Sequence, residues 1–380
     1  MNKTGKKKVL YVSTIDETIK CFLIPHMITL REAGYDVDVA CFTETDVKII
    51  EKEGFKVYHV NFDRRFYHWS NFVAFFEILR IFKNNKYDIL HTHTPVASFI
   101  SRLAAKLANV PLIIYTIHGA HFHEYCGKFN YAFYYTLEKM AGAFTNVFIT
   151  INTDDHKKLT TMFPGKNVFY TKGVGLNLEK FRPDNINSAV MMKLRNELGI
   201  VDGEKVIGIV AEMIPRKRHI DFLQAASLIS TKQKNVKYLI VGKGKLMDDV
   251  KEAAVALNIQ KNCIFTGYRN DILWLMSIID IFVFPSIQEG LPVAVMEAMS
   301  MKKPVIATNI RGCRDLILDK KTGILIPVRN PKHIAEAVLH LLKNPKEAAM
   351  LGDNARKRIE SDFELSTILK QLLSIYRGIT

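Results

Sequence analysis

Short apolar runs alternate with helical patterns along the first part of this chain. In the helical stretches, such as residues 21–34 and 97–110, apolar positions recur with the spacing of one helix face. The apolar runs between them have the length of strands and lie at residues 6–14, 35–42, 56–62, 87–94, 112–119 and 146–152. Strands joined by helices form βαβ units, in which a parallel sheet is covered on both faces. A doubly wound α/β domain is therefore predicted here.

A second series of the same kind follows. Its apolar runs lie at residues 204–212, 236–244, 262–268, 279–286, 303–309 and 323–328. Between the two series, residues 173–188 are rich in Gly, Asn and Pro, a composition typical of connecting segments. The chain is therefore predicted to contain two similar domains.

The domain boundaries follow from these patterns. The first domain is predicted over residues 1–175, a linker over 176–189 and the second domain over 190–364. Residues 365–380 form an amphipathic helix that either caps the second domain or crosses back to the first. Ligands of doubly wound sheets bind beyond the carboxyl ends of the strands. Functional residues are therefore expected directly after the apolar runs, facing a cleft between the domains.

Composition limits the partners and the location. Among 380 residues, 53 Lys and Arg outnumber 38 Asp and Glu, and the net charge is +15. This excess favours phosphorylated small molecules or a membrane surface as partners, and no zinc-finger, RNP-like or basic-zipper pattern indicates nucleic acid. No apolar run approaches the roughly 20 residues of a membrane span. The start lacks a signal-peptide pattern, and the five Cys form no CxxC pair. A cytoplasmic, membrane-associated or free location is expected.

Two acids, Glu289 and Glu297, interrupt a mostly apolar segment over residues 286–308. A strand precedes Glu289, and a helix is predicted to begin at Pro292, because Pro is favoured in the first turn. Glu289 would then lie in the strand-to-helix loop and Glu297 in the helix. The free N–H groups of the Gly290–Val293 turn suit a phosphate or a polar sugar ring. The alternative is a capping Glu289 and a solvated Glu297.

The same segment, S-x-x-E-G-L-P-x-x-x-M-E-A-M followed by P-V-I-A-T, resembles the E-x7-E signature of retaining GT-B glycosyltransferases of the GT4 (group 1) family. The resemblance extends to a V-G-x-G turn at Val241–Gly244 and to F-x-G-Y-R-x-D at Phe265–Asp271. YTIHGAHFHEY and FITINTDD resemble the capsule and exopolysaccharide branch of the family. The resemblance implies the GT-B fold, with two Rossmann-like domains facing across a cleft.

The resemblance also implies roles for the glutamate segment. Glu297 would bind the ribose hydroxyls of a nucleotide, and Glu289 would contact the hydroxyls of the donor sugar. The backbone of Gly290, Leu291 and Pro292 would lie beside that sugar.

Two further strand-end loops are implied to bind the nucleotide. Gly242 belongs to the V-G-x-G turn, and Gly267 and Arg269 follow another strand, where the family holds the nucleobase largely through backbone groups. The alternative for the Arg269 side chain is an ordinary surface position.

The diphosphate needs cations, because negative charge develops on it as it leaves. Many members of the family carry a Gly-Arg pair directly after the first strand of the second domain and a Lys a few residues later. Ala211 and Glu212 stand at the positions of the pair, which is a departure from the family. Lys217 matches the Lys, and Arg216 is the candidate to replace the missing Arg. The alternative is a basic, solvated first turn of a helix.

Five histidines lie at adjoining strand ends of the first domain. His118 ends a strand, and the resemblance implies that it contacts the donor sugar or its phosphate. His91 and His93 end the previous strand, while His121 and His123 are candidates for an acceptor pocket or for ordinary packing. No carboxylate or thiolate spacing typical of a metal site accompanies them. No metal is expected, and the resemblance implies none.

Aromatic residues and cations are interleaved in residues 64–83 and 125–142. Such segments suit the inner face of a cytoplasmic membrane, and core packing is the alternative. The resemblance implies a lipid-linked or oligosaccharide acceptor in capsule, exopolysaccharide or O-antigen assembly.

The function favoured by these observations is a retaining, metal-independent glycosyltransferase with a nucleotide-sugar donor, a UDP-sugar in preference, and no other cofactor. The mechanism that the resemblance implies is front-face attack, in which the leaving phosphate helps to take the acceptor proton. Two alternatives are a nucleotide-sugar epimerase of the same fold and a non-catalytic scaffold in a polysaccharide assembly complex. The epimerase would turn over nucleotide sugars without an acceptor, and the scaffold would bind without donor hydrolysis.

Overall fold

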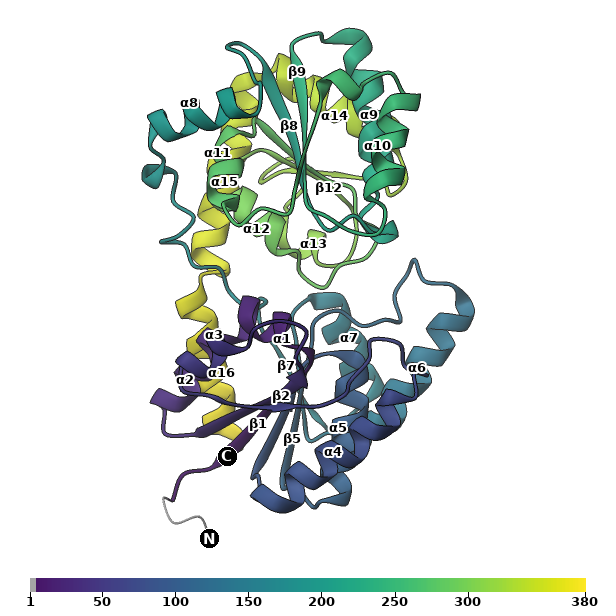
Figure 1. Ribbon diagram of the computed structural model, residues 1–380, viewed down its shortest axis with the longest axis vertical. Coiled ribbons are helices and arrows are strands. Elements are labelled where there is room, and N and C mark those ends of the chain that lie inside the picture. Colours follow the sequence, from purple (N-terminus) through teal and green to yellow (C-terminus); the bar gives the residue numbers. More distant parts are fainter. Residues whose placement is uncertain (1–4) are drawn as a thin grey trace. The chain divides into compact units, whose positions relative to one another are not determined.

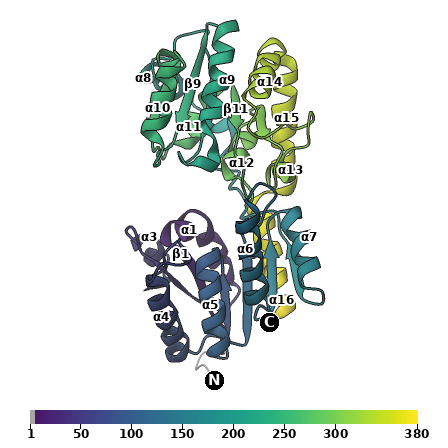
Figure 2. The same cartoon turned by 90° about the vertical axis from the view of Figure 1, so that its right-hand side faces the viewer.

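The structure, a computed structural model, describes residues 5–380 (Figure 1). Residues 1–4, the start of the predicted first domain, lie outside the described part. The chain divides into two compact units. The first ends at Gly175 and takes up Ser366–Thr380, and the second spans Leu176–Leu365. In each unit, helices flank a central sheet, as the turned view shows (Figure 2).

The first unit is built on a parallel sheet of seven strands in the order β3-β2-β1-β4-β5-β6-β7. Its strands are β1 (Lys8–Ile15), β2 (Asp36–Phe42), β3 (Lys56–His59), β4 (Ile89–Thr92), β5 (Leu112–Ile117), β6 (Val147–Thr150) and β7 (Asn167–Tyr170). Each predicted apolar run coincides with one of the first six. The pattern misses β7, an edge strand of four residues whose side chains are exposed or only partly buried.

Side chains of β1 alternate between the two faces of this sheet. Val9 and Tyr11 pack in one core with α2 (Ile24–Glu32), α3 (Lys48–Lys52) and α16 (Leu365–Ile379). Leu10 and Val12 pack in another with α4 (Ser70–Asn85) and α5 (Pro95–Leu107). The helices of the unit are α1 (Asp16–Thr18), the π-helix η1 (Ile19–Leu23), α2 (Ile24–Glu32), α3 (Lys48–Lys52), α4 (Ser70–Asn85), α5 (Pro95–Leu107), α6 (Lys128–Gly142), α7 (Thr153–Met162) and α16 (Leu365–Ile379). A strand that is apolar at successive positions is thus buried on both faces.

The second unit has a parallel sheet of six strands in the order β10-β9-β8-β11-β12-β13. The strands are β8 (Lys205–Val210), β9 (Val236–Val241), β10 (Cys263–Gly267), β11 (Ile281–Phe284), β12 (Val305–Thr308) and β13 (Ile324–Ile326). The α-helices are α8 (Ser188–Glu197), α9 (His219–Lys232), α10 (Met247–Ala256), α11 (Ile272–Ile278), α12 (Val293–Ser300), α13 (Cys313–Leu316), α14 (Pro331–Lys343) and α15 (Pro345–Asp362). The short 3-10 helices are η2 (Pro183–Asn185), η3 (Pro215–Lys217) and η4 (Gln260–Asn262).

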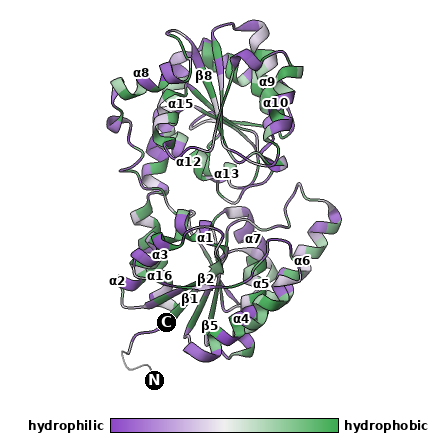
Figure 3. Ribbon diagram, in the orientation of Figure 1, coloured by the Kyte–Doolittle hydropathy of each residue, from purple (hydrophilic) through white to green (hydrophobic). Residues whose placement is uncertain are grey.

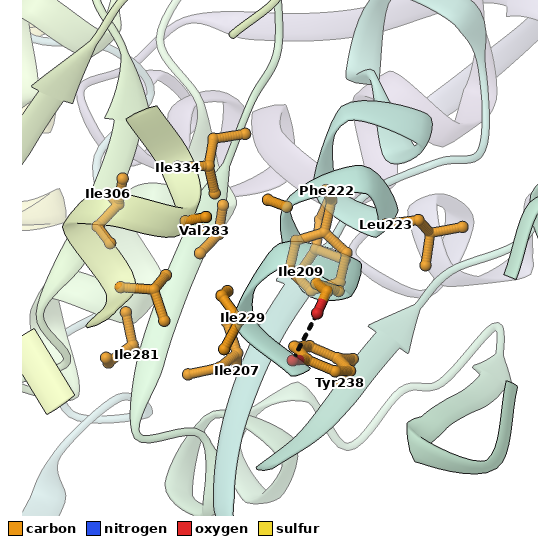
Figure 4. Close-up of a cluster of buried hydrophobic side chains, with 14 of the residues drawn as sticks. Ile207, Ile209, Phe222, Leu223, Ile229, Tyr238, Ile281, Val283, Ile306 and Ile334 are labelled. Atoms are coloured by element: carbon orange, nitrogen blue, oxygen red, sulfur yellow. Dashed lines mark hydrogen bonds between the residues drawn. The ribbon is translucent and has the colours of Figure 1, made fainter. Parts of the chain in front are cut away.

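The core on one face of this sheet is made largely of branched aliphatic residues (Figure 4). Ile207 and Ile209 of β8 and Val283 of β11 pack against α9 and its neighbours. The buried Tyr238 is accommodated there because its hydroxyl donates a hydrogen bond to the Ala226 carbonyl at 2.8 Å. The apolar strands at the centre of each unit contrast with the polar outer helix faces (Figure 3).

The predicted fold class, two doubly wound α/β domains with parallel sheets, is confirmed. Residues 176–189, predicted to be a linker, are grouped with the second unit, in which Leu176 exchanges backbone hydrogen bonds with Phe363 and Leu365. Across residues 5–380, no helix is long and apolar enough to cross a bilayer.

Candidate active site

Two loops meet at the carboxyl edge of the second sheet. One follows β8 and holds Arg216 and Lys217 in η3; the other follows β11 and holds Glu289. β8 and β11 are hydrogen-bonded neighbours, so their carboxyl ends lie side by side. The Ile287 N–H donates to the Arg216 carbonyl at 2.9 Å and ties the two loops together.

Three side chains converge on one carboxylate oxygen of Glu289. Its Oε1 lies 2.6 Å from Nζ of Lys217, 3.2 Å from Nη1 of Arg216 and 2.6 Å from Oγ of Ser286. The Glu289 side chain is only 8% exposed, against 39% for Arg216. The structure therefore brings together three of the residues predicted for the diphosphate and donor sugar.

The charge of Glu289 survives its burial. Burial alone would raise the pKa of this carboxyl, but the Lys217 ammonium and the Arg216 guanidinium outweigh it and hold the pKa below its usual value. Lys217 is further stabilised by the ring of Phe284, whose centroid lies 4.9 Å from Nζ. Removing one member of a buried ion pair leaves an uncompensated charge, at a cost of roughly 3–5 kcal/mol.

The glutamate turn is supported from behind by residues that follow β12. Arg311 is buried, and its Nε donates to the Glu289 carbonyl at 2.9 Å. Gly312 has a φ of +79°, and a Cβ there would lie 2.4 Å from the Gly290 carbonyl oxygen. Sequence reasoning missed these two residues and Ser286, although the expectation that sites follow strand ends would have pointed to them.

The pKa of Glu297 shifts in the opposite direction to that of Glu289. The helix α12 begins at Val293, with Pro292 at its N-cap, one residue later than predicted. The partly buried Glu297 carboxylate has no hydrogen-bond or ion-pair partner among the described residues. Burial raises the pKa of Glu297 to about 7, with a smaller opposing effect from Lys180. This carboxyl is thus free to receive hydrogen-bond donors.

Backbone donors lie between the two glutamates. Within residues 5–380, the N–H groups of Gly290 and Leu291 have no hydrogen-bond acceptor. They belong to the turn that precedes α12, where unpaired N–H groups and the helix dipole favour a negative charge.

The predicted nucleotide loops are held mainly by their own contacts. A Cβ on Gly242, whose φ is +133°, would lie 2.1 Å from the Ala211 carbonyl oxygen, so the close approach of the two loops requires glycine. The Gly242 N–H donates to the Gly267 carbonyl at 2.9 Å. Glu212, at the position of the family's Arg, is exposed.

Arg269 is occupied by carboxylates of its own unit. Its Nε and one terminal nitrogen lie 2.8 and 2.5 Å from the Asp271 oxygens, and the other terminal nitrogen lies 3.4 Å from Glu197. The side chain is therefore part of an ion-pair cluster at the end of β10, beside the backbone of Gly267.

The histidines form a chain at the carboxyl edge of the first sheet. Nδ1 of His93 lies 3.1 Å from Nε2 of His118, and the rings of His91 and His93 stack with centroids 4.3 Å apart. Nε2 of His91 lies 2.7 Å from the hydroxyl of Thr116, and its Nδ1 lies 2.7 Å from the hydroxyl of Tyr376 on α16. Burial, with a smaller effect of His26, lowers the pKa of His118 to about 4.

His121 and His123 have different surroundings. His121 lines a largely aromatic pocket of the first unit with Phe99 and Tyr134, and its ring centroid lies 4.9 Å from that of Tyr134. Nδ1 of His123 accepts the Tyr125 N–H at 3.3 Å within a local turn. Among the described residues, no group of three or more His, Cys, Asp or Glu could hold a metal ion.

Family models match both parts of the chain. The model described as "Glycosyl transferases group 1" matches residues 191–358, and that described as "Glycosyl transferase 4-like" matches residues 8–152. A solved structure, that of Alr3699/HepE from Anabaena in complex with UDP and glucose, has a TM-score of 0.82 at 18% identity and covers 98% of this chain and 100% of its own. This likeness identifies the GT-B fold.

Relatives agree over most of the chain. The protein described as "Putative glycosyltransferase EpsD" of Bacillus subtilis (strain 168) is 29% identical over 97% of this chain and 96% of its own. The UDP-Gal:alpha-D-GlcNAc-diphosphoundecaprenol alpha-1,3-galactosyltransferase of Escherichia coli is 30% identical over 79% and 77%. The capsular polysaccharide biosynthesis glycosyltransferase CapM of Staphylococcus aureus is 26% identical over 97% of each chain. From these matches and the geometry above, the chain belongs to the group 1 glycosyl transferases.

Proposed function

We propose that the protein is a retaining glycosyltransferase that moves a sugar from a UDP-sugar to a lipid-linked saccharide in polysaccharide assembly. The observation that carries this proposal is the convergence of Lys217 and Arg216 on Glu289 beside a turn with free N–H groups. Relatives support the substrate classes. The Escherichia coli relative is named for UDP-Gal and a diphosphoundecaprenol acceptor, CapM for capsular polysaccharide, and HepE is described with UDP and glucose.

Lys217 and Arg216 are assigned to the diphosphate. Negative charge grows on the leaving group in the transition state, and fixed cations in a poorly solvated place stabilise it most. The ion pairs with Glu289 hold both cations in position. The N–H groups of Gly290 and Leu291 add two neutral donors.

Glu297 is assigned to the ribose and Glu289 to the donor sugar. The unpartnered Glu297 carboxylate can accept hydrogen bonds from two adjacent hydroxyls, which would offset its desolvation. Because the Arg269 side chain is held by Asp271, the nucleobase contact is assigned to the backbone around Gly267. His118 is assigned a contact with the donor sugar or its phosphate.

The proposed reaction needs no residue as a base. The acceptor hydroxyl oxygen forms a bond to the anomeric carbon on the face from which the diphosphate departs. The bond between that carbon and the diphosphate oxygen breaks, and the acceptor proton passes to the leaving phosphate. Configuration is thereby retained. The positive charge is supplied by side chains, so we propose that the reaction is metal-independent.

A membrane contact is proposed on α4, which contains much of the aromatic segment 64–83. One set of its side chains is buried in the core and another is exposed. Ile78 and Phe82 pack in the core, whereas Phe72 is 70% exposed. Exposed residues at helical spacing form one stripe of this helix, which we call the α4 stripe: Phe72, Phe76, Arg80 and Lys83. Trp69, at the N-cap, is 72% exposed. Aromatic side chains and cations on one exposed face suit an anionic lipid surface.

The test is a thermal-shift screen of UDP-, GDP- and ADP-sugars on three proteins. We expect a shift of several degrees with one UDP-sugar for wild type, loss of that shift in Lys217→Ala, and its retention in Arg218→Gln. Arg218 is a matched control, because it is the adjacent cation but pairs with Asp221 at 2.6 Å. No shift with any nucleotide sugar, or equal loss in both variants, would overturn the donor site.

Product analysis then separates the alternatives. A transferase converts the donor only when a polyprenyl-diphosphate-linked saccharide is present and retains the anomeric configuration in the product. Conversion to an epimeric nucleotide sugar without acceptor would indicate the epimerase. Binding with no turnover under either condition would indicate a scaffold.

A further inference from the structure

A proton must be shared between His93 and His118. His93 follows β4 and His118 follows β5, which are neighbouring strands of the first sheet. Nδ1 of His93 and Nε2 of His118 are 3.1 Å apart, a hydrogen-bond distance. In a hydrogen bond between two imidazoles, one nitrogen carries the proton and the other supplies the lone pair.

The second nitrogen of His93 indicates which ring is the donor. Its Nε2 is buried and has no hydrogen-bond partner within residues 5–380. If His118 donated from Nε2, neutral His93 would carry its proton on its own Nε2, as a buried N–H without an acceptor. If His93 donates from Nδ1, only a lone pair is left unpaired. Among backbone groups, orphaned buried N–H groups are rarer than under-satisfied acceptors. We apply the same order to the imidazole nitrogens, so the second arrangement is favoured.

A second proton does not enter the pair near neutral pH. Burial, with smaller effects of the neighbouring histidines, lowers the pKa of His93 well below its usual value. The pKa of His118 is about 4, for the reasons given above. Both rings are therefore neutral, and each holds one proton.

We propose that His93 is a positioning residue that donates from Nδ1 to Nε2 of His118 and so fixes the His118 proton on Nδ1. The only lone pair of the His118 ring is then occupied. His118 acts as an uncharged hydrogen-bond donor through Nδ1 and not as a general base. This assignment deepens, and rests on, the proposed function in which His118 contacts the donor.

Neighbouring rings hold His93 in the required orientation. His91 stacks on it at 4.3 Å with an interplanar angle of 28°, and the ring centroid of Tyr11 lies 4.9 Å away. His91 is fixed at both nitrogens by hydroxyls of Thr116 and Tyr376. Rotation of the His93 ring would disturb this packing, so its Nδ1 stays directed at His118.

A neutral donor suits the chemistry proposed for this enzyme. An N–H at Nδ1 of His118 can donate a hydrogen bond to a hydroxyl or phosphate oxygen of the nucleotide sugar without adding a charge to the site. Nδ1 of His118 has no hydrogen-bond partner among the described residues. Front-face attack places the acceptor proton on the leaving phosphate, so occupation of Nε2 removes no group that the reaction needs.

The first test reads the tautomer directly in donor-free, full-length protein. Long-range proton–nitrogen spectra of protein labelled with 15N-histidine, assigned with His118→Asn, distinguish protonated from bare ring nitrogens. Between pH 6 and 8 we expect His118 to carry its proton on Nδ1 and none on Nε2. A proton on Nε2, alone or together with Nδ1, would overturn the proposal without affecting the proposed transferase function.

The second test separates positioning from packing. His93→Leu removes the donor, whereas His93→Asn keeps an amide donor near the Nδ1 position. We expect His93→Leu to lower kcat by roughly 10- to 100-fold, with a smaller change in the donor KM, as misplaced contact groups do. His93→Asn should restore most of the activity and the Nδ1 proton of His118.

A matched control is His156→Leu. His156 is another histidine of the first unit, partly buried where His93 is buried, and its Nδ1 lies 3.3 Å from Thr150 Oγ1. The His156→Leu substitution should leave kcat and the His118 tautomer unchanged. Wild-type kcat in His93→Leu, or equal losses in the Leu and Asn variants with an unchanged His118 tautomer, would contradict the positioning role. If wild type itself transfers no sugar, the proposed function fails, while the tautomer assignment stands on the spectra.

Discussion

The carboxyl edges of the two parallel sheets can be compared residue by residue. In the first unit, this edge carries stacked imidazoles whose partners are hydroxyls and other imidazoles. In the second, it carries an ammonium, a guanidinium and two carboxyls within one strand-turn-helix segment and the loop beside it. The architecture is shared, yet the histidine cluster is uncharged and the Lys217–Glu289 cluster is charged. The first edge has its charges elsewhere, in the Asp16–Lys20 ion pair directly after β1.

Burial has a different outcome at each edge because the partners differ. His91 and His93 are almost fully buried, and none of the partners described for them carries a formal charge, so desolvation lowers their pKa and disfavours the charged, doubly protonated ring. Glu289 is buried nearly as deeply, but two cations lie within hydrogen-bond distance, so its charge remains. Partner chemistry, not depth, decides which groups are charged.

The largest expected effect tests the charged edge. Lys217→Ala should lower kcat by about 10²- to 10³-fold, because it removes a fixed cation from the developing diphosphate charge. Steady-state transfer assays measure the change, and Lys217→Arg should recover part of the activity. A Lys217→Ala enzyme within twofold of wild type would remove the cation from the mechanism.

The next effect concerns the histidine cluster of the first unit in acid. The folded pKa of His118, about 4, lies below its ordinary value, so between about pH 4 and 6.5 the unfolded chain binds more protons than the folded one. Stability should therefore rise with pH through this window. Urea unfolding should show a His118→Asn variant that is less acid-sensitive than wild type, by about 2 kcal/mol between pH 4.5 and 7. Equal acid sensitivity in the two proteins would mean that His118 is charged when folded.

The next, smaller effect concerns Glu297, whose pKa is raised where that of His118 is lowered. Its carboxyl has a raised pKa of about 7 in the free protein, and hydroxyl donors would favour the charged form. Binding of a UDP-sugar, whose diphosphate is esterified at both ends and does not titrate in this range, should therefore release a proton, and its affinity should rise with pH by about tenfold between pH 6 and 8. Calorimetry in buffers of different ionisation enthalpy measures both quantities. In Glu297→Gln the affinity should be lower and independent of pH in this range, and an unchanged affinity would contradict the ribose assignment.

The smallest expected effect lies outside both edges. Trp69→Ser with Phe72→Ser should weaken binding to vesicles containing anionic phosphatidylglycerol several-fold, as loss of buried apolar area predicts. Sedimentation with vesicles measures this, and Val255→Ser, a 56% exposed apolar position in the second unit, is the control. Equal binding by the double variant and the control would exclude the α4 stripe as a lipid contact.

The sequence was sufficient to predict the fold because strand burial on both faces leaves a strong local pattern. Every predicted apolar run coincides with a strand. Among the described residues, only the edge strand β7, whose side chains are exposed or partly buried, was not predicted. The strand-turn-helix placement of Glu289 and Glu297 was equally local, and the helix start differed by one residue.

Pairings between distant residues could not be predicted. The Lys217–Glu289 contact joins positions 72 residues apart, and the support of the glutamate turn by Arg311 depends on the backbone path after β12. The resemblance suggested a ligand role for Arg269, but whether its guanidinium meets a ligand or Asp271 depends on side-chain geometry. Gly242 shows the same limit, since its conformation serves contact with Ala211 whether or not a ligand is near.

The position of α16 has a consequence for the order of protein synthesis. This helix contributes Leu372, Ile375 and Tyr376 to a core of the first unit, although the entire second unit precedes it in the chain. During synthesis on the ribosome, the core on one face of the first sheet, the face of His91, cannot be completed until α16 has been made. The residues of α16 are made after the whole second unit. The second unit can therefore complete its core first, and the unit that begins the chain is the last to be closed.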